Sequence, residues 1–198
     1  MPKIIDKEKK RETIALSAKK LILQKGIHTI TVAEVAKTAN IGKGTIYEYF
    51  KNKNEIVFVL ITILMKEHFE ILQKKITDAT TTKEKIRVFS GFFYDDAQKE
   101  LRQIYKQFIA LSLADPDDEM MQFHKQSLDA YYEWFKQIIE TGVRNGELVS
   151  HSQRLIQGIF ATGEGLFIQY CVTNMEERLK NDLDDFIDNI FYLLEKKS

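Results

Sequence analysis

The chain has 198 residues, of which 44% are hydrophobic and 29% charged, a balance typical of a globular protein that buries its own core. Its single cysteine, Cys171, excludes internal disulfides and cysteine-based zinc sites and fits a reducing compartment. The most apolar run, residues 56–65, is shorter than the roughly 20 residues of a membrane-spanning helix, and the charged start of the chain lacks the apolar core of a signal peptide. We therefore expect a cytoplasmic protein.

The net charge of zero hides an uneven distribution along the chain. Residues 1–53 contain 12 lysines and arginines against 5 acidic residues, whereas the remainder contains 17 against 24. A basic N-terminal segment on an acidic body is the asymmetry expected of a protein that meets a polyanion with one end.

The first predicted helix covers residues 6–26, because apolar residues repeat at helical spacing and Gly26 follows them. Basic residues crowd its start, where they oppose the helix dipole unless anions lie close. They form either a solvated surface cluster or a set of contacts to DNA phosphates: Lys7, Lys9, Lys10 and Arg11. With only two prolines and no runs of alternating polarity, the whole chain is predicted to be all-α.

The segment from Thr31 to Phe50 contains two short helical patterns separated by a turn. Thr31 and Glu34 fit a capping box at the start of the first pattern, and Asn40 suits the left-handed conformation that ends it. In the second pattern Ile46 and Phe50 lie four residues apart and face inward, which leaves polar and basic side chains pointing outward. This arrangement predicts a helix-turn-helix whose second helix enters the DNA major groove.

The same segment resembles the DNA-binding motif of the TetR family of bacterial transcriptional regulators. The resemblance rests on the block Gly-Thr-Ile-Tyr-Glu-Tyr-Phe at residues 44–50, followed by Asn-Lys-Asn-Glu at residues 52–55. Asn40 stands where the family usually has glycine, and Gly42 where it favours serine or threonine, so a phosphate contact from a hydroxyl at position 42 is lost. The family implies a three-helix DNA-binding domain, residues 1–52, with the helix-turn-helix at 31–50.

Residue-by-residue matching implies a DNA-binding surface made of seven residues: Thr31, Lys43, Gly44, Thr45, Tyr47, Tyr49 and Lys53. Lys43 is the candidate for reading guanine, and Gly44 allows a close approach to the DNA backbone. Tyr49 is expected to give its hydroxyl to a phosphate, while Thr31 and Lys53 stand at helix N-termini that favour phosphate oxygens. For Tyr47 and Tyr49, packing of the ring against the first helix is the alternative.

Six more helices are predicted after the motif, which gives nine in all: residues 53–78, 83–95, 98–114, a helix ending near 141, 151–173 and 175–195. Asp115, followed by Pro116, is the expected cap of the fourth of these, and Ser150 and Asn174 are the expected caps of the last two. The family implies that residues 53–198 form an effector-binding and dimerisation domain, with the helix at 53–78 as its connection to the DNA-binding domain.

Residues beyond 53 hold 19 of the 22 aromatic side chains. Aromatic residues at helical spacing usually pack in a core, but the family implies an effector cavity, which this composition would suit to a hydrophobic or aromatic molecule. The candidate lining residues are Phe93, Tyr105, Phe108, Tyr131, Trp134, Phe135, Phe167 and Tyr170. Glu164, an acid within an apolar stretch, either pairs with a cationic ligand or with a surface arginine.

The family also implies that the last two helices pair with those of a second subunit. Small residues on a helix permit a close approach, and glycine otherwise costs about 1 kcal/mol there. The expected interface consists of Gly158, Ala161, Gly165, Leu183, Ile187 and Ile190. The alternative is that both helices only close the core of one chain.

These features predict a homodimeric regulator, in the first place a repressor, that binds a pseudo-palindromic DNA operator and a small hydrophobic effector. No metal, cofactor or enzymatic activity is expected, since the four histidines lie far apart and no catalytic motif is present. Two rival interpretations are a helical lipophile-binding protein that no longer reads DNA and a non-specific DNA-coating protein.

Overall fold

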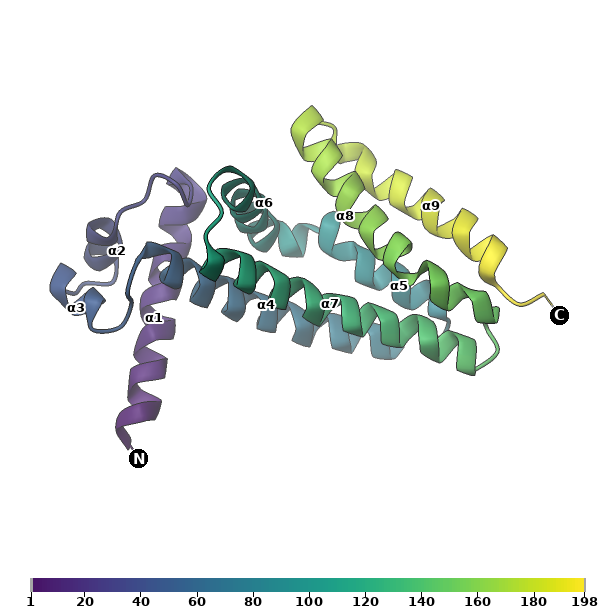
Figure 1. Cartoon of the computed structure of the whole chain (residues 1–198), viewed down its shortest axis with the longest axis horizontal. Coiled ribbons are helices and arrows are strands. Elements are labelled where there is room, and N and C mark those ends of the chain that lie inside the picture. The colour runs from purple at the N-terminus through teal and green to yellow at the C-terminus, as the bar shows by residue number, and fades with distance from the viewer. Residues whose placement is uncertain (1, 198) are drawn as a thin grey trace. The chain divides into compact units, whose positions relative to one another are not determined.

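The computed structural model describes residues 2–197, and side chains from residue 7 onward. These residues form nine α-helices (Figure 1): α1 Pro2–Lys25, α2 Val32–Thr38, α3 Lys43–Tyr47, α4 Lys53–Asp78, α5 Thr82–Ser90, α6 Lys99–Ala114, α7 Asp118–Arg144, α8 Ile156–Thr173 and α9 Leu179–Leu194. Four short 3₁₀ helices join them: Gly91–Phe93, Asp96–Gln98, Ser150–Leu155 and Glu176–Arg178. The predicted all-α fold is confirmed. The first of these 3₁₀ turns ends α5 earlier than predicted.

The chain divides into two compact units. The N-terminal unit consists of Met1–His68 and Glu100–Phe123, and the C-terminal unit of Phe69–Lys99 and His124–Ser198. Both α4 and α7 therefore contribute residues to both units. The domain boundary expected after residue 52 marks the end of the DNA-binding segment. The division into two compact units does not test it, so it stays a prediction.

The core of the N-terminal unit is built from the apolar stripes of five helices. Its fully buried side chains include Ile14 and Ile22 of α1, Val35 of α2, Ile46 of α3 and Leu60 of α4. From α6, Gln107 accepts a hydrogen bond from the Ile27 backbone N–H at 2.8 Å, and Gln103 donates to the Leu23 carbonyl at 3.1 Å. These two amides bind polar backbone groups at the end of α1 that have no partner within the helix.

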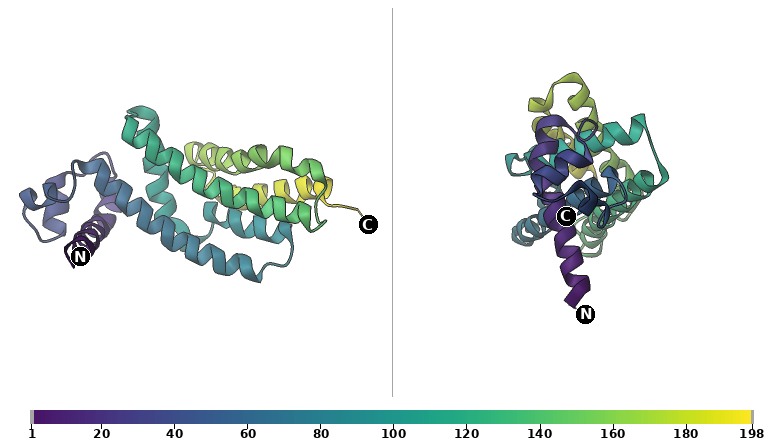
Figure 2. Two further views of the ribbon diagram at one scale, coloured as in Figure 1. Left: turned by 60° about the horizontal axis from the view of Figure 1, so that its bottom comes forward. Right: turned by 90° about the vertical axis from the view of Figure 1, so that its left-hand side faces the viewer.

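The core of the C-terminal unit lies between α4, α5, α7, α8 and α9, with Phe89, Phe135 and Phe191 among its buried side chains. The end of α9 returns to the α7–α8 connection (Figure 2). There the Val149 N–H donates to the Leu194 carbonyl at 2.9 Å.

Gly142 of α7 lies against the start of α5. A Cβ at this position would lie 2.3 Å from Oγ1 of Thr82, so only glycine permits the contact. The backbone N–H of Thr82 also donates to the Glu147 carboxylate at 2.7 Å, which fixes the α5 terminus at the same place.

Two predicted helix-end signals are confirmed. Thr31 with Glu34 forms the expected complete capping box, and Thr81 with Glu84 forms a second one at the start of α5. Asn40 has a φ of 55°, the left-handed conformation expected after α2. Each of these signals involves residues within a few positions of one another, which is why the sequence reveals them.

Three predicted caps are wrong. Asp117 rather than Asp115 caps α7, because the helix begins only at Asp118 and the Asp117 carboxylate accepts from the Met120 N–H at 2.7 Å. Asn174, with a φ of 55°, ends α8 instead of starting the next helix. Ser150 begins a 3₁₀ helix without a side-chain cap bond.

No helix among the described residues is long and apolar enough to cross a membrane.

Candidate functional site

The start of α2 is held by the Thr31–Glu34 box. The Thr31 N–H donates to the Glu34 carboxylate at 2.9 Å, and the Glu34 N–H donates to the Thr31 hydroxyl at 3.2 Å. Lys25 lies 2.6 Å from the other carboxylate oxygen, and this bond, with those from Thr31, lowers the pKa of Glu34 from 4.5 to about 2. Thr31 remains exposed, but its N–H is already occupied by a carboxylate.

The recognition helix α3 is positioned by two side chains, Ile46 and Phe50, which are 0% and 2% exposed. Its opposite side is open to solvent: Lys43 and Gly44 are exposed, and Tyr47 is 52% exposed. No atom lies within 4 Å of where a Cβ on Gly44 would be, so the helix surface there is unobstructed. Because Ile46 and Phe50 point into the core, the side chains on the other side of the helix point outward.

Lys53 opens α4 beside this helix. Its ammonium donates to the carbonyl of His28 at 2.8 Å, and burial lowers its pKa. An ammonium has three donors, so this bond leaves others for a phosphate. The Asn52 side chain caps α4 by accepting from the Glu55 N–H at 2.9 Å.

Arg11 has a role that the sequence does not reveal. Its guanidinium donates to the carbonyl of Tyr49 and to the carboxylate of Glu55, the latter at 3.3 Å, and lies 4.5 Å above the centre of the Phe50 ring. Glu55 in turn accepts from the Lys51 N–H at 2.6 Å. Arg11 therefore joins α1 to the α3–α4 junction through two partners in its own chain. No local signal separates it from its basic neighbours, because Lys10 and Lys7 lie four and seven residues before Ile14 and so fall on the same stripe of α1.

Within the C-terminal unit, a small cavity of about 30 Å³ lies between α5, α7, α8 and α9. Its lining is apolar apart from one serine: Ile86, Phe89, Ser90, Phe93, Phe135, Ile159, Phe160, Gly163, Leu183, Phe186 and Ile187. Pockets that hold drug-sized ligands measure about 300–1,000 Å³, so such a ligand could enter this cavity only if lining side chains moved. Gly163 matters here because a Cβ on it would lie 3.0 Å from the Phe93 ring.

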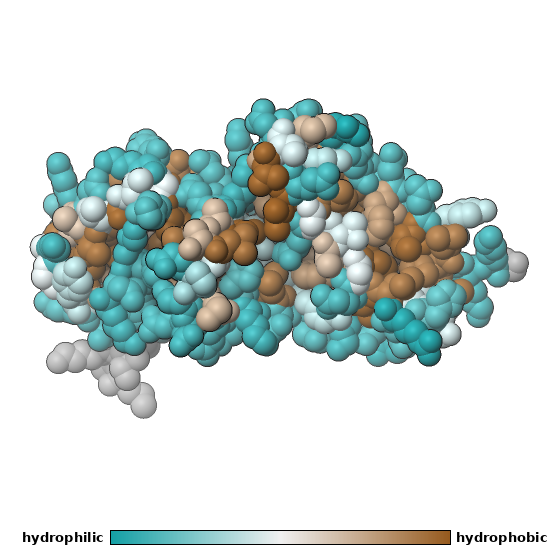
Figure 3. Space-filling view, turned by 45° about the horizontal axis from the view of Figure 1, so that its top comes forward, coloured by the Kyte–Doolittle hydropathy of each residue, from teal (hydrophilic) through white to brown (hydrophobic). Residues whose placement is uncertain are grey.

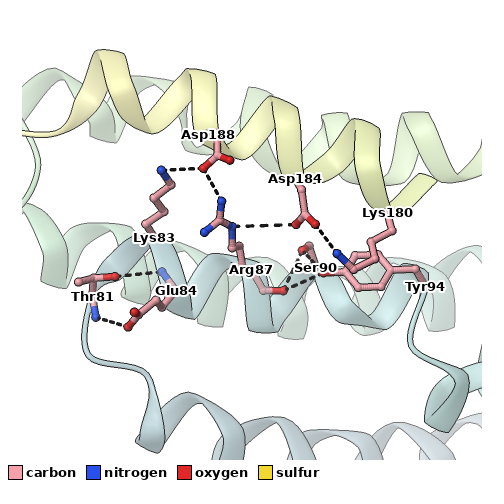
Figure 4. A network of polar contacts seen from close by, with 9 residues as sticks. All are labelled: Thr81, Lys83, Glu84, Arg87, Ser90, Tyr94, Lys180, Asp184 and Asp188. Atoms are coloured by element: carbon pink, nitrogen blue, oxygen red, sulfur yellow. Dashed lines mark hydrogen bonds and ion pairs between the residues drawn. The ribbon is translucent and has the colours of Figure 1, made fainter. Parts of the chain in front are cut away.

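A strip of ion pairs runs along α5 and α9 (Figure 4). Lys83 lies 2.7 Å from Asp188, which also accepts a bond from Arg87, and Lys180 lies 2.6 Å from Asp184. The contact with Lys83 is the main cause of the lowered pKa of Asp188. These residues alternate along both helices with cavity-lining ones, so α5 and α9 carry both the ion pairs and part of the cavity lining.

The predicted pocket residues are not all brought together. Phe93 and Phe135 line the cavity, and Phe167 packs against Phe93 with ring centroids 5.4 Å apart. Tyr131 and Trp134 instead pack against Phe69, with centroids 4.4 and 5.2 Å away.

The other three predicted pocket residues lie elsewhere. The Tyr170 hydroxyl donates to Asp182 on α9. Tyr105 and Phe108 belong to the N-terminal unit, where the Phe108 ring contacts Phe58 and Phe123. Contacts between helices that are distant in the sequence decide which aromatic side chains pack in the core and which line a cavity. Helical periodicity cannot predict these contacts.

Comparison with known proteins identifies the family. A sequence model described as bacterial regulatory proteins of the tetR family matches residues 14–60. Over 133 residues the chain is 32% identical to the fatty acid metabolism regulator protein of Bacillus subtilis, an alignment that covers 67% of each chain. The chain belongs to the TetR family. This confirms the family suggested by the motif around α3, and as a TetR protein the chain is a DNA-binding transcriptional regulator.

Solved TetR-family structures share the fold. A TetR regulator from Cytophaga hutchinsonii superposes with a TM-score of 0.77 at 19% identity, covering 98% of both chains. The regulator FadR from Bacillus subtilis, in complex with stearoyl-CoA, superposes with a TM-score of 0.67 at 25% identity, covering 88% of this chain and 96% of that one.

The TetR chain exposes an apolar stripe along α8. Five residues three or four positions apart share this exposed side: Gly158, Ala161, Gly165, Ile168 and Val172. Val172 is 78% exposed, and no atom of the chain lies within 4 Å of a Cβ built on Gly158 or Gly165. Figure 3 shows hydrophobic side chains gathered on the C-terminal half of the face that it presents.

Two of the residues expected in a dimer interface have another role. Leu183 and Ile187 of α9 are 2% and 3% exposed within a single chain, where both line the small cavity. They therefore have no surface to offer a second subunit, which corrects the prediction for both. Ile190 is partly buried against the same core.

Proposed function

We propose that this TetR-family regulator is a homodimeric repressor that leaves its operator when a hydrophobic small molecule binds to the C-terminal unit. The observation that carries the proposal is the recognition helix: Ile46 and Phe50 fix it to the core, and Lys43, Gly44 and Tyr47 are left exposed on one short helix. A helix held in this way can enter the major groove without rearrangement of the unit that supports it.

The two kinds of DNA contact are assigned to different residues. Lys43, at the start of α3, is proposed to read guanine through O6 and N7, and Thr45 and Tyr47 lie beside it on the same helix. Tyr49 and Lys53 are proposed to bind phosphates, which fixes the register of the helix without reading sequence. Thr31 is proposed as a weaker phosphate contact through its hydroxyl, because the Glu34 carboxylate already occupies its N–H.

The apolar lining of the cavity supports a hydrophobic effector. Two similar proteins point the same way: one is named a fatty acid metabolism regulator, and the solved FadR holds stearoyl-CoA. Because α4 contributes to both units, displacement of its second half by a ligand would move the end that carries Lys53. Effector and operator then weaken each other's binding by a coupling of about 1–3 kcal/mol, which is the same in both directions.

A second subunit is proposed to cover the exposed stripe on α8. Its glycines leave room for a close helix approach, and the exposed Ile168 and Val172 supply apolar surface. A two-fold dimer places two recognition helices on half-sites about 34–36 Å apart, which compensates for the few contacts that one short helix can make.

Three substitutions test the assignment of roles. Tyr49→Phe and Lys53→Ala are expected to weaken binding to operator and random DNA by the same factor. Lys43→Ala is expected to weaken operator binding more, by about 1–3 kcal/mol, because it removes a base contact. Fluorescence anisotropy at fixed salt measures both affinities, and equal losses on the two DNAs for Lys43→Ala would remove it from the base-reading set.

A further inference from the structure

Three aromatic side chains lie between the small cavity of the C-terminal unit and solvent. Most of the residues that line this cavity are buried, and the half-buried ones are Phe93, Phe160 and Phe186. An engineered apolar cavity that binds benzene measures about 150 Å³. A ligand therefore enters this cavity of about 30 Å³ only after a lining side chain has moved, and the half-buried rings have space on their solvent side.

Phe93 differs from the other two half-buried rings in its backbone. Phe160 and Phe186 lie inside α8 and α9, whereas Phe93 is the last residue of the 3₁₀ helix Gly91–Phe93. The next residue, Tyr94, has a φ of −138°, so the chain leaves helical geometry directly after Phe93. A 3₁₀ turn has poorer hydrogen-bond geometry than an α-helix, so the backbone that carries Phe93 resists movement least.

The Phe93 ring fills a recess that a glycine leaves open in α8. A Cβ on Gly163 would lie 3.0 Å from Cε2 of Phe93, which is closer than ordinary van der Waals contact. Gly163 is buried in the interior of α8, where glycine is less favourable than alanine. Phe167, one turn further along α8, contacts the same ring, with centroids 5.4 Å apart. The recess beside Gly163 therefore holds one phenyl ring.

We propose that Phe93 is the movable wall of the effector cavity and selects effectors by their width. When the ring turns towards solvent, the recess beside Gly163 joins the cavity, and an apolar part of the effector enters it. Because the recess holds a single ring, an unbranched chain fits there and a branched cage does not. This inference rests on the proposed function, which places a hydrophobic effector in the C-terminal unit, and it names the residue and the effector shape that decide binding.

The exchange of ring for effector has a measurable cost. The entering chain buries apolar surface in place of the ring, so little apolar burial is lost. Binding is nevertheless weakened by the fraction of molecules in which the ring already points outward. Such minor states are typically populated at about 0.1–10%, so removal of the ring should raise the affinity for a slender ligand at least about tenfold.

Decanoate and adamantane-1-carboxylate, two carboxylates of similar carbon number and different width, test the proposal. Their binding is followed by the fluorescence of Trp134, whose ring lies 6.0 Å from that of the cavity residue Phe89. The unchanged protein should bind decanoate more tightly than adamantane-1-carboxylate. We expect Phe93→Ala to bind decanoate at least about tenfold more tightly than the unchanged protein.

A second substitution in the Phe93→Ala protein shows where the chain of decanoate lies. Gly163→Ala then no longer meets the ring, and its methyl group occupies the recess, so it should lower the decanoate affinity about tenfold. Gly165→Ala is the matched control, because a Cβ there meets no atom of the chain within 4 Å and points to the exposed side of α8. It should leave the affinity unchanged. Equal decanoate affinities of Phe93→Ala and the unchanged protein, or equal effects of the two glycine substitutions, would overturn the proposal.

A fluorine label makes the test independent of how well Phe93→Ala folds. With 4-fluorophenylalanine in place of Phe93, saturating decanoate should make the label more accessible to a soluble paramagnetic quencher in fluorine NMR, and the same label in place of Phe160 should stay protected. No change at Phe93 would also overturn the proposal. These measurements contain no DNA. Equal affinity of the protein for operator and random duplexes would therefore defeat the proposed repressor function and leave the role of Phe93 to be decided here.

Discussion

Substitution of Arg11 tests whether α1 is joined to the recognition helix as the structure shows. Arg11→Ala removes two charge-assisted hydrogen bonds, to the Tyr49 carbonyl and the Glu55 carboxylate, and a ring contact at 4.5 Å to Phe50. Hydrogen bonds to charged groups contribute about 1.5–3 kcal/mol and an exposed cation–π contact about 0.5–1. Because the Arg11 side chain is 26% exposed, solvent screening lowers the total. We expect Arg11→Ala to lower the free energy of unfolding by about 2–3 kcal/mol.

Urea unfolding followed by far-ultraviolet circular dichroism measures this loss. Fluorescence of the single tryptophan, Trp134, is less suitable because it lies in the C-terminal unit. Arg11→Lys keeps the charge but cannot reach both acceptors with the planar fork of a guanidinium, so it should lose about half as much. Lys9→Ala, on the exposed side of α1, should change the free energy of unfolding by less than about 0.5 kcal/mol. A similarly small effect of Arg11→Ala would refute the proposed anchoring role.

Substitutions at four further positions have predicted effects. Gly142→Ala should destabilise the fold by about 1–3 kcal/mol in thermal unfolding, since its Cβ would collide with Thr82, and an unchanged melting temperature would contradict this. Gly158→Ala meets no atom of its own chain, so it should leave the fold intact but raise the dimer dissociation constant in sedimentation. Asn40→Ala should lower the free energy of unfolding in urea by about 1 kcal/mol, because alanine is strained at a φ of 55°. Asn40→Gly should leave it unchanged. The pKa of Glu34 in the folded chain, about 2, lies below its ordinary 4.5. The ionised carboxylate therefore contributes fully to the free energy of unfolding above about pH 5, and this contribution is lost as the pH falls towards 2. In Glu34→Gln the free energy of unfolding should depend less on pH over that range.

Local sequence signals predicted local structure well. The Thr31–Glu34 box needs only two residues three positions apart, and the positive φ of Asn40 follows from the short polar side chain that this conformation tolerates. The outward direction of Lys43 follows from its helix anchors, Ile46 and Phe50.

Contacts between distant segments were not predictable. Arg11 bonds to groups 38 and 44 residues away, so nothing in its neighbourhood distinguished it from the phosphate-binding candidates beside it. The same limit applies to Leu183 and Ile187, whose helical stripe fits an intrachain core as well as a dimer interface. Even locally, the order of residues favours Asp115 as a cap, whereas Asp117 has the required geometry.

The central claim is that α3 reads a DNA sequence. Its most direct test is an anisotropy titration of the unchanged protein with the DNA upstream of its own gene and with a random duplex of equal length, both at about 150 mM salt. The account predicts that the upstream DNA binds roughly 10³-fold more tightly or better, as specific regulators do over non-specific sites. Equal affinities for the two duplexes would contradict it.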